Sequence, residues 1–287
     1  MDMSEYLTPP RLRSEDFTVL QAIKTVAETE GKTLEDAICI YQILPASIQN
    51  APAFRDKLTG LLRYEYGLPY HIGRRPNRTV VVGTNVAHQV SILLNGLLVM
   101  RRLLTEQQVR HFCKNLGDKS RHLDYLSELD PILRPTTEFK ADYEGKGFGR
   151  GKRKIDWHIA FDGRTSCLLD VKHRLKGLID YMQQVSTEFH TEKAKKEFDA
   201  PLPDGLFANS EAKFRPVLDE RWQGIWILTQ VYYDDHALHQ AFDSLDPQKI
   251  QFVVLTHFRG EARLLTKLDR IRPWLMEKFN LTEMKKR

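Results

Sequence analysis

Apolar positions in the first 117 residues recur mostly at intervals of three and four, which is the period of an α-helix. In the first such stretch Phe17, Leu20 and Ile23 follow polar residues that can cap a helix, and Gly31 ends the pattern. A short β-branched run over 79–82 interrupts the helical periodicity. The pattern predicts helices over residues 14–30, 33–43, 52–66 and 85–116.

The second half of the chain changes to the alternating pattern of β-strands. Residues 155–161 and 165–172 form two such runs, and Asp162-Gly163-Arg164 between them is a strong signal for a hairpin turn. Apolar strands are also predicted over 224–233 and 250–258. The helices predicted around these strands cover residues 121–130, 175–198 and 235–242, with another helical segment closing the chain.

This order of helices and strands predicts an α/β fold with a mixed central β-sheet flanked by helices. We expect two regions. Residues 1–117 form a mainly helical accessory region with a role in nucleic-acid binding, and residues 118–287 form the sheet domain.

Composition and length fit a soluble, cytoplasmic protein without a membrane partner. Of the 287 residues, 41% are hydrophobic, which suffices for a core, yet the most apolar stretch, 90–100, is shorter than the ~20 residues that span a bilayer. The three cysteines are far apart and lack metal-ligand spacing, which favours a reducing compartment. The net charge of +5 is compatible with a polyanionic partner without requiring one.

Candidate chemistry lies on the predicted hairpin. Because residues two apart share one face of a strand, Asp170 and Lys172 point to the same side, and Asp156 can join them from the partner strand. Two carboxylates held close together repel unless a cation lies between them. Magnesium accepts one or two carboxylates together with water and phosphate oxygens, and a nearby lysine can bind an attacking water. Hydrolysis of a phosphodiester suits such a site best.

The spacing of Asp156, thirteen residues and then Asp170-Val171-Lys172 resembles the signature of the PD-(D/E)XK, or restriction endonuclease-like, nuclease superfamily. The predicted helix, hairpin, helix and further strands resemble the core of that superfamily over residues 118–260. Two positions depart from its pattern: Ile155 precedes the first acid where proline is common, and the second acid is aspartate rather than glutamate.

The resemblance implies roles for particular residues. Asp156, Asp170 and the carbonyl of Val171 would bind Mg²⁺, for which Mn²⁺ can substitute, and Lys172 would be the catalytic lysine. Many members carry a further acid on the helix before the sheet. Glu128 is the candidate here, with Glu138 as the substitute if the first strand starts earlier.

Basic residues flank the signature on both sides. Lys152, Arg153 and Lys154 follow a glycine-punctuated loop over 145–151, and Arg174 follows the second strand. Clustered cations on such a loop suit contacts to a phosphate backbone. A flexible, solvated loop without a ligand explains the same residues equally well.

The sequence thus predicts a metal-dependent nuclease that acts on nucleic acid, with double-stranded DNA favoured over RNA and a homodimer expected because both strands of a duplex must be cut. Two alternatives stay open. One is a non-catalytic nucleic-acid-binding or interaction subunit that keeps the nuclease-like fold. The other is an exposed Asp170–Lys172 pair on a solvated strand face, without a function.

Overall fold

The computed structural model describes most of the chain, and it divides into two compact units, Met1–Leu129 and Asp130–Arg287. The division follows Leu129, so the helical segment predicted over 121–130 falls mainly in the first unit. The described residues are 18–50, 70–75, 78–82, 86–118, 121–145, 147–161, 165–173, 207, 209–216, 221–229, 235–257 and 261–284.

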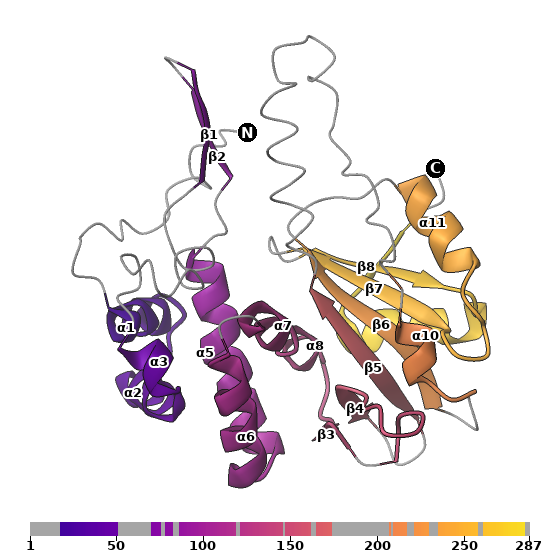
Figure 1. Ribbon diagram of the computed structural model, residues 1–287, viewed down its shortest axis with the longest axis horizontal. Helices are drawn as coiled ribbons and strands as arrows, with labels where there is room; N and C mark the ends of the chain where they lie inside the picture. The colour runs from indigo at the N-terminus through magenta and orange to yellow at the C-terminus, as the bar shows by residue number, and fades with distance from the viewer. Residues whose placement is uncertain are drawn as a thin grey trace. The chain divides into compact units, whose positions relative to one another are not determined.

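The described part of the first unit is mainly helical, with one β-hairpin (Figure 1). Its helices are α1 (Val19–Thr29), α2 (Leu34–Ile43), α3 (Ala46–Gln49), α5 (Val86–Leu103), α6 (Glu106–Leu116) and α7 (His122–Ser127). The antiparallel strands β1 (Tyr70–Arg75) and β2 (Arg78–Val82) form the hairpin.

Side-chain caps explain where α2 and α6 begin. Thr33 and Asp36 form a capping box at the start of α2, which agrees with the helix predicted over 33–43. Thr105 forms a second capping box with Gln108, and this box divides the helix predicted over 85–116 into α5 and α6. The helix predicted over 52–66 lies outside the described residues.

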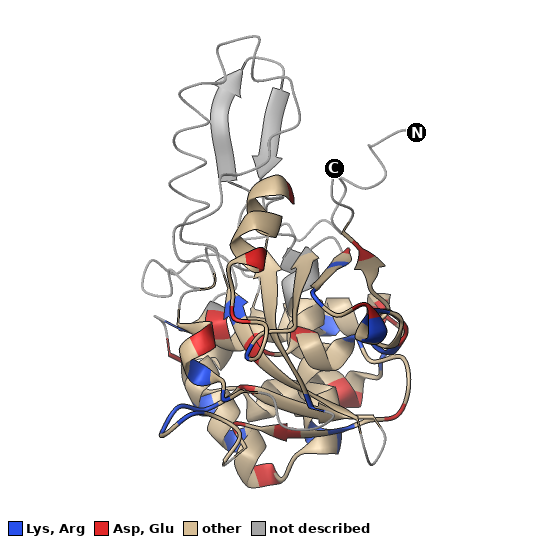
Figure 2. Ribbon diagram, turned by 90° about the vertical axis from the view of Figure 1, so that its right-hand side faces the viewer, with Lys and Arg blue, Asp and Glu red and all other residues tan. Residues whose placement is uncertain are grey.

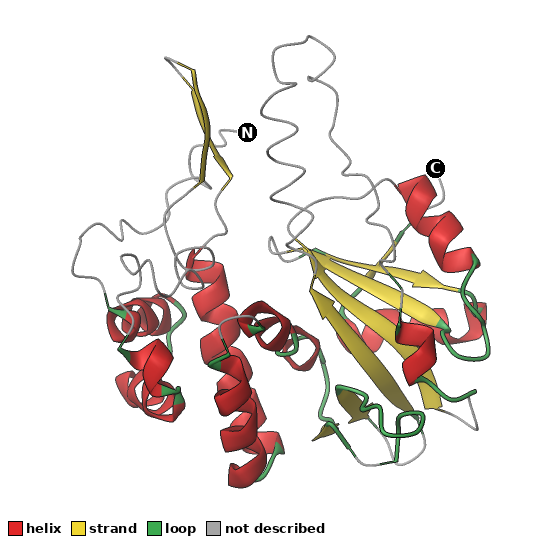
Figure 3. Cartoon of the chain, viewed as in Figure 1, coloured by secondary structure: helices red, strands yellow, loops and turns green. Residues whose placement is uncertain are grey.

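The second unit is built on one mixed sheet, which confirms the α/β class (Figure 3). The strands follow one another in the sheet in chain order: β3 (Lys140–Tyr143), β4 (Trp157–Ala160), β5 (Ser166–His173), β6 (Arg221–Thr229), β7 (Phe252–His257), β8 (Ala262–Thr266) and β9 (Thr282–Glu283). The helical segments among the described residues of this unit are α8 (Asp130–Leu133), α10 (Ser210–Lys213), α11 (Asp235–Asp243), η2 (Asp269–Ile271) and α12 (Arg272–Phe279).

Strand direction changes across the sheet. β3, β4 and β5 form an antiparallel meander, whereas β5, β6 and β7 run parallel to one another. β8 then pairs antiparallel with β7, and β9 pairs parallel with β8. The predicted hairpin of β4 and β5 is confirmed by its register, although its turn, residues 162–164, lies outside the described residues.

The two faces of the sheet have separate cores. On one face, side chains of β5, β6 and β7 pack with Phe207 and Phe214, which flank α10, and with Leu238 and Phe242 of α11. On the other face, the ring of Trp226 lies against Phe279 of α12, with ring centroids 5.4 Å apart. The site described below belongs to the face that carries α10 and α11.

Several sequence predictions need correction. No strand is predicted where β1, Tyr70–Arg75, lies, and the segment after 258, expected to be helical, contains β8 and β9 as well as α12. The strand predicted from 155 begins at Trp157. The helix predicted over 175–198 lies outside the described residues. Among the described helices, we find none with both the length and the apolar character needed to cross a membrane.

Candidate active site

Two aspartates and a lysine named from the sequence come together beside β4 and β5. Asp156 immediately precedes β4, and the antiparallel register that pairs Trp157 with Leu169 carries it to a position beside Asp170. Asp170 and Lys172 are two residues apart on β5, so their side chains share one face of the sheet. In the register they pair with Ile225 and Ile227 of β6, which belong to the core on the α10 face. The structure therefore gathers Asp156, Asp170 and Lys172, as strand alternation predicts.

Asp170 is fully buried, with 0% of its surface exposed. Its Oδ2 accepts a hydrogen bond from the Ser210 hydroxyl at 2.7 Å and lies 2.9 Å from the Lys172 ammonium. Its Oδ1 forms an ion pair with Lys213. Burial opposes ionisation of this carboxyl, but the two lysines outweigh it and lower the pKa of Asp170 below its usual value. Asp170 is thus an ionised carboxylate inside the protein.

Asp156 lies in a different electrostatic environment. Its Oδ2 accepts a hydrogen bond of 2.6 Å from the amide of Val171, and its Oδ1 is 3.7 Å from the Lys213 ammonium. Burial raises the pKa of Asp156 to about 7; Lys213 acts against this shift, and the charge of Asp170 adds to it. The pair therefore combines one firmly ionised carboxylate with one that is easily protonated in the absence of further cations.

Ser210 and Lys213 of α10 are not among the site residues that the sequence predicts. They are three residues apart, so one helical turn places both side chains on the same side. Ser210 is fully buried, and the side chain of Lys213 is 24% exposed. The sequence signal was weak, because a helix of four residues has no apolar periodicity of its own.

The exposed-pair alternative for Asp170 and Lys172 is wrong. The Asp170 carboxylate is completely buried, and the Lys172 side chain is only 15% exposed. Burying charged groups costs free energy that only close partners offset. Burying two carboxylates and two ammonium groups therefore costs the folded protein free energy, which their mutual contacts offset.

The donor set of this cluster fits a magnesium ion in its chemistry. Two carboxylates converge on one cationic group, the Lys213 ammonium, and Mg²⁺ commonly binds through one or two carboxylates plus water. Among the described residues no group of three or more His, Cys, Asp or Glu side chains gathers at a metal-binding distance, so a dedicated all-protein cage is absent from that part of the chain. The amide of Val171 binds Asp156, and the role of its carbonyl as a ligand stays a prediction.

The two further acids named from the sequence lie in different units. Glu128 ends α7 in the first unit, and its side chain is buried. Glu138 is exposed and lies two residues before β3 in the second unit. Participation of either residue in the site stays a prediction.

The basic loop before β4 is connected to the site through its backbone. Lys152, Arg153 and Lys154 are exposed, and this consecutive basic run is blue in Figure 2. The amide of Arg150 donates a hydrogen bond of 2.7 Å to the carbonyl of Lys213, so the loop is fixed to α10. Arg174, named with this group, lies outside the described residues.

Close packing also holds this loop in place. The ring of Phe148 lies against His158 of β4, with centroids 4.5 Å apart. The loop folds back on itself at Gly149, where a Cβ would lie 1.9 Å from the carbonyl oxygen of Arg153. Only glycine fits at this position, because any side chain would clash with that carbonyl. The cationic side chains are thus exposed on a backbone that contacts the site.

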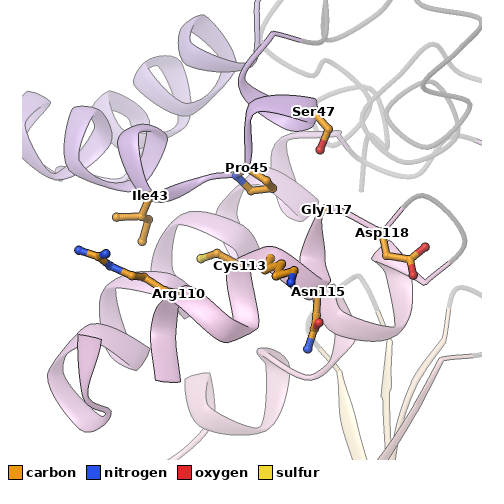
Figure 4. Close-up of a pocket in the computed structure, with 9 residues that line it drawn as sticks. Ile43, Pro45, Ser47, Arg110, Cys113, Asn115, Gly117 and Asp118 are labelled. Carbon is orange, nitrogen blue, oxygen red and sulfur yellow. The ribbon is translucent and has the colours of Figure 1, made fainter. Parts of the chain in front are cut away.

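A separate cavity of about 520 Å³ lies in the first unit between the end of α2 and α6 (Figure 4). Pro45 and Gly117 approach closely at its wall, and Cys113 lines it. Burial raises the pKa of the Cys113 thiol to about 12, so the nucleophilic thiolate is not formed near neutral pH. We assign no chemistry to this cavity.

Comparison with protein family models, with curated proteins and with solved structures finds no match to this chain.

Proposed function

We propose that this protein is a metal-dependent nuclease that hydrolyses phosphodiester bonds, with double-stranded DNA as its substrate. The observation that carries the proposal is the buried convergence of Asp156, Asp170 and Lys172. The antiparallel meander of β3, β4 and β5, followed by the parallel strand β6, supports the resemblance to a restriction endonuclease-like core.

Each residue of the site has a definite task in this proposal. Asp156 and Asp170 would hold Mg²⁺, which supplies Lewis-acid stabilisation and lowers the pKa of bound water. Lys172 lies 2.9 Å from Asp170 Oδ2 and keeps part of its side chain exposed, so it can donate to an attacking water and offset charge on the phosphorane. Ser210 holds Asp170 in orientation through its hydroxyl.

The surroundings of the site are consistent with a nucleic-acid substrate. Lys152, Arg153 and Lys154 expose three successive cations on a loop fixed to α10, which suits contacts to a phosphate backbone. A cut through both strands favours a homodimer, because one site faces one scissile phosphate. All three cysteines are free, which is in keeping with a cytoplasmic location.

One observation favours a second candidate, a non-catalytic nucleic-acid-binding or interaction subunit. Two carboxylates and two ammonium groups sum to zero charge, and both oxygens of Asp170 already have partners within the protein. Such a cluster is stable without a metal, so it can serve structure alone.

Cleavage of supercoiled plasmid separates the two candidates. We expect the wild-type protein to nick or linearise the plasmid with Mg²⁺ and not with EDTA, and Lys172→Ala to lose about 100-fold or more of the rate. Lys249→Ala removes an ion-paired lysine elsewhere in the second unit and should cleave like the wild type. Intact plasmid in every lane, together with a gel shift that ignores Mg²⁺, would favour the binding subunit.

A further inference from the structure

The Lys213 ammonium occupies the position between the two carboxylates. It forms an ion pair with Asp170 Oδ1 and lies 3.7 Å from Asp156 Oδ1. Lys172, in comparison, forms its ion pair with Asp170 Oδ2. The two lysines therefore differ in position: Lys213 lies between the two acids, and Lys172 lies beside Asp170.

A divalent cation shared by both carboxylates would need the same space. Mg²⁺ binds carboxylate oxygens at about 2.0–2.1 Å, so an ion shared by the two acids would compete for the Oδ1 atoms of Asp156 and Asp170 that face the Lys213 ammonium. The ammonium of Lys213 and a bridging Mg²⁺ thus exclude each other.

The placement of Lys213 allows its ammonium to leave. It is the last residue of a four-residue helix, its side chain is 24% exposed, and four rotatable carbons connect the ammonium to the backbone. Its carbonyl meanwhile accepts the hydrogen bond from the Arg150 amide, so the backbone can stay fixed while the side chain turns outward.

We propose that Lys213 is a resident counter-cation that holds the two carboxylates together in the metal-free protein and is displaced when a divalent metal ion binds. The inference rests on the proposed function, since it concerns the same metal site. It implies that Lys213 weakens metal binding while stabilising the metal-free fold, and that Lys172 remains beside Asp170 in both states.

Metal affinity tests the inference directly. Binding of Mn²⁺ to the full-length protein is measured from the electron paramagnetic resonance signal of the free ion, for the wild type, Lys213→Gln and Lys213→Arg. We expect Lys213→Gln to bind Mn²⁺ about tenfold more tightly, because no ammonium must be displaced, and Lys213→Arg to bind like the wild type, because it retains the charge. Lys249→Gln, which alters an ion pair with Asp246, is the matched control and should bind like the wild type.

A second measurement needs no variant. Acylation of lysine amines, followed by mass spectrometry, should modify Lys213 several-fold faster with saturating Mg²⁺ than with EDTA, since the released ammonium becomes exposed. The labelling rate of Lys249 should not change.

The outcomes separate this inference from the nuclease proposal. If the wild type binds Mn²⁺ but Lys213→Gln binds it no more tightly, or if metal leaves the labelling of Lys213 unchanged, Lys213 is not displaced and only the inference fails. If neither protein binds Mn²⁺, both the inference and the metal-dependent nuclease are wrong.

Discussion

His122 shows how the surroundings of one residue determine its charge. The side chain is 1% exposed, and its Nδ1 lies 2.7 Å from the carbonyl oxygen of Leu116, to which the neutral ring can donate. Burial lowers the pKa of His122 to about 4, and the hydrogen bond to Leu116 offsets only part of that effect. The unfolded chain, in which histidine has its ordinary pKa near 6.5, therefore binds more protons between pH 4 and 6.5.

This difference predicts a loss of stability in mild acid. The contribution of His122 is fully present above pH 6.5 and is lost as the pH falls toward 4, by up to about 3 kcal/mol at roughly 1.4 kcal/mol per pH unit. His122→Gln cannot titrate, so its free energy of unfolding should fall less steeply across this window when measured by urea denaturation. His111→Gln replaces an exposed histidine of the same unit and should keep the wild-type pH dependence. A variant at His122 with the wild-type slope would contradict this explanation.

At the scale of single residues, the sequence predicted part of the site. Alternation along β5 identified Asp170 and Lys172, because the face of a strand residue follows from its position alone. Ser210 and Lys213 could not be found in this way, since they reach Asp170 from a segment 40 and 43 residues further along the chain. Tertiary packing brings Ser210 and Lys213 to Asp170, and no local sequence pattern predicts that contact.

At the scale of the strands, Gly224 determines how closely the centre of the sheet packs. It pairs in register with Phe252 of β7, and a Cβ at this position would lie 2.3 Å from Cε2 of the Phe252 ring. Phe252 is fully buried, so its ring has little room to move. Glycine in β6 therefore makes space for a large side chain in β7.

Gly224→Ala should consequently destabilise the protein by about 1–3 kcal/mol through overpacking, measured as a shift in denaturant midpoint at constant slope. The combination of Gly224→Ala with Phe252→Leu tests the cause. Because the smaller side chain relieves the clash, the double variant should lose less stability than the two single variants together. Additive losses would show that the ring is not the source of the destabilisation.

The sequence predicted elements best where local chemistry defines them. α2 follows its N-cap Thr33, in agreement with the helix predicted over 33–43, and the alternating run over 165–172 predicts β5 without tertiary information. β8 and β9 were missed because each is short and gains its stability from a neighbouring strand. Ile155 lies outside β4, which begins at Trp157, yet it belongs to the same core cluster as Leu168 of β5.

At the scale of the whole molecule, positive charge exceeds negative charge only slightly. Lysine and arginine exceed aspartate and glutamate by five, and both signs occur along the described ribbon (Figure 2). A net charge of this size promotes association with a polyanion only weakly. Any strong affinity for DNA must therefore come from cations placed together, and in the described part of the chain the loop with Lys152, Arg153 and Lys154 is such a group next to the site.

The salt dependence of DNA binding can measure that contribution. Each phosphate neutralised by a cation releases counterions and adds about 0.9 to the slope of log affinity against log salt concentration. Replacing Lys152, Arg153 and Lys154 together with glutamine lowers the net charge from +5 to +2, and the slope should fall by up to about 2.7. Fluorescence anisotropy with a labelled duplex over a salt series, in EDTA to prevent cleavage, gives the slope.

The control must separate the effect of positive charge on this loop from the effect of the protein's net charge. Glutamine at Lys249, Arg270 and Lys278 removes the same three charges from other parts of the second unit. If the loop contacts phosphates, the control keeps most of the wild-type slope, because long-range attraction is screened within about 10 Å at ordinary ionic strength. Equal losses in the two triple variants would mean that DNA responds only to net charge, and the loop would then have no specific place in the nucleic-acid interface.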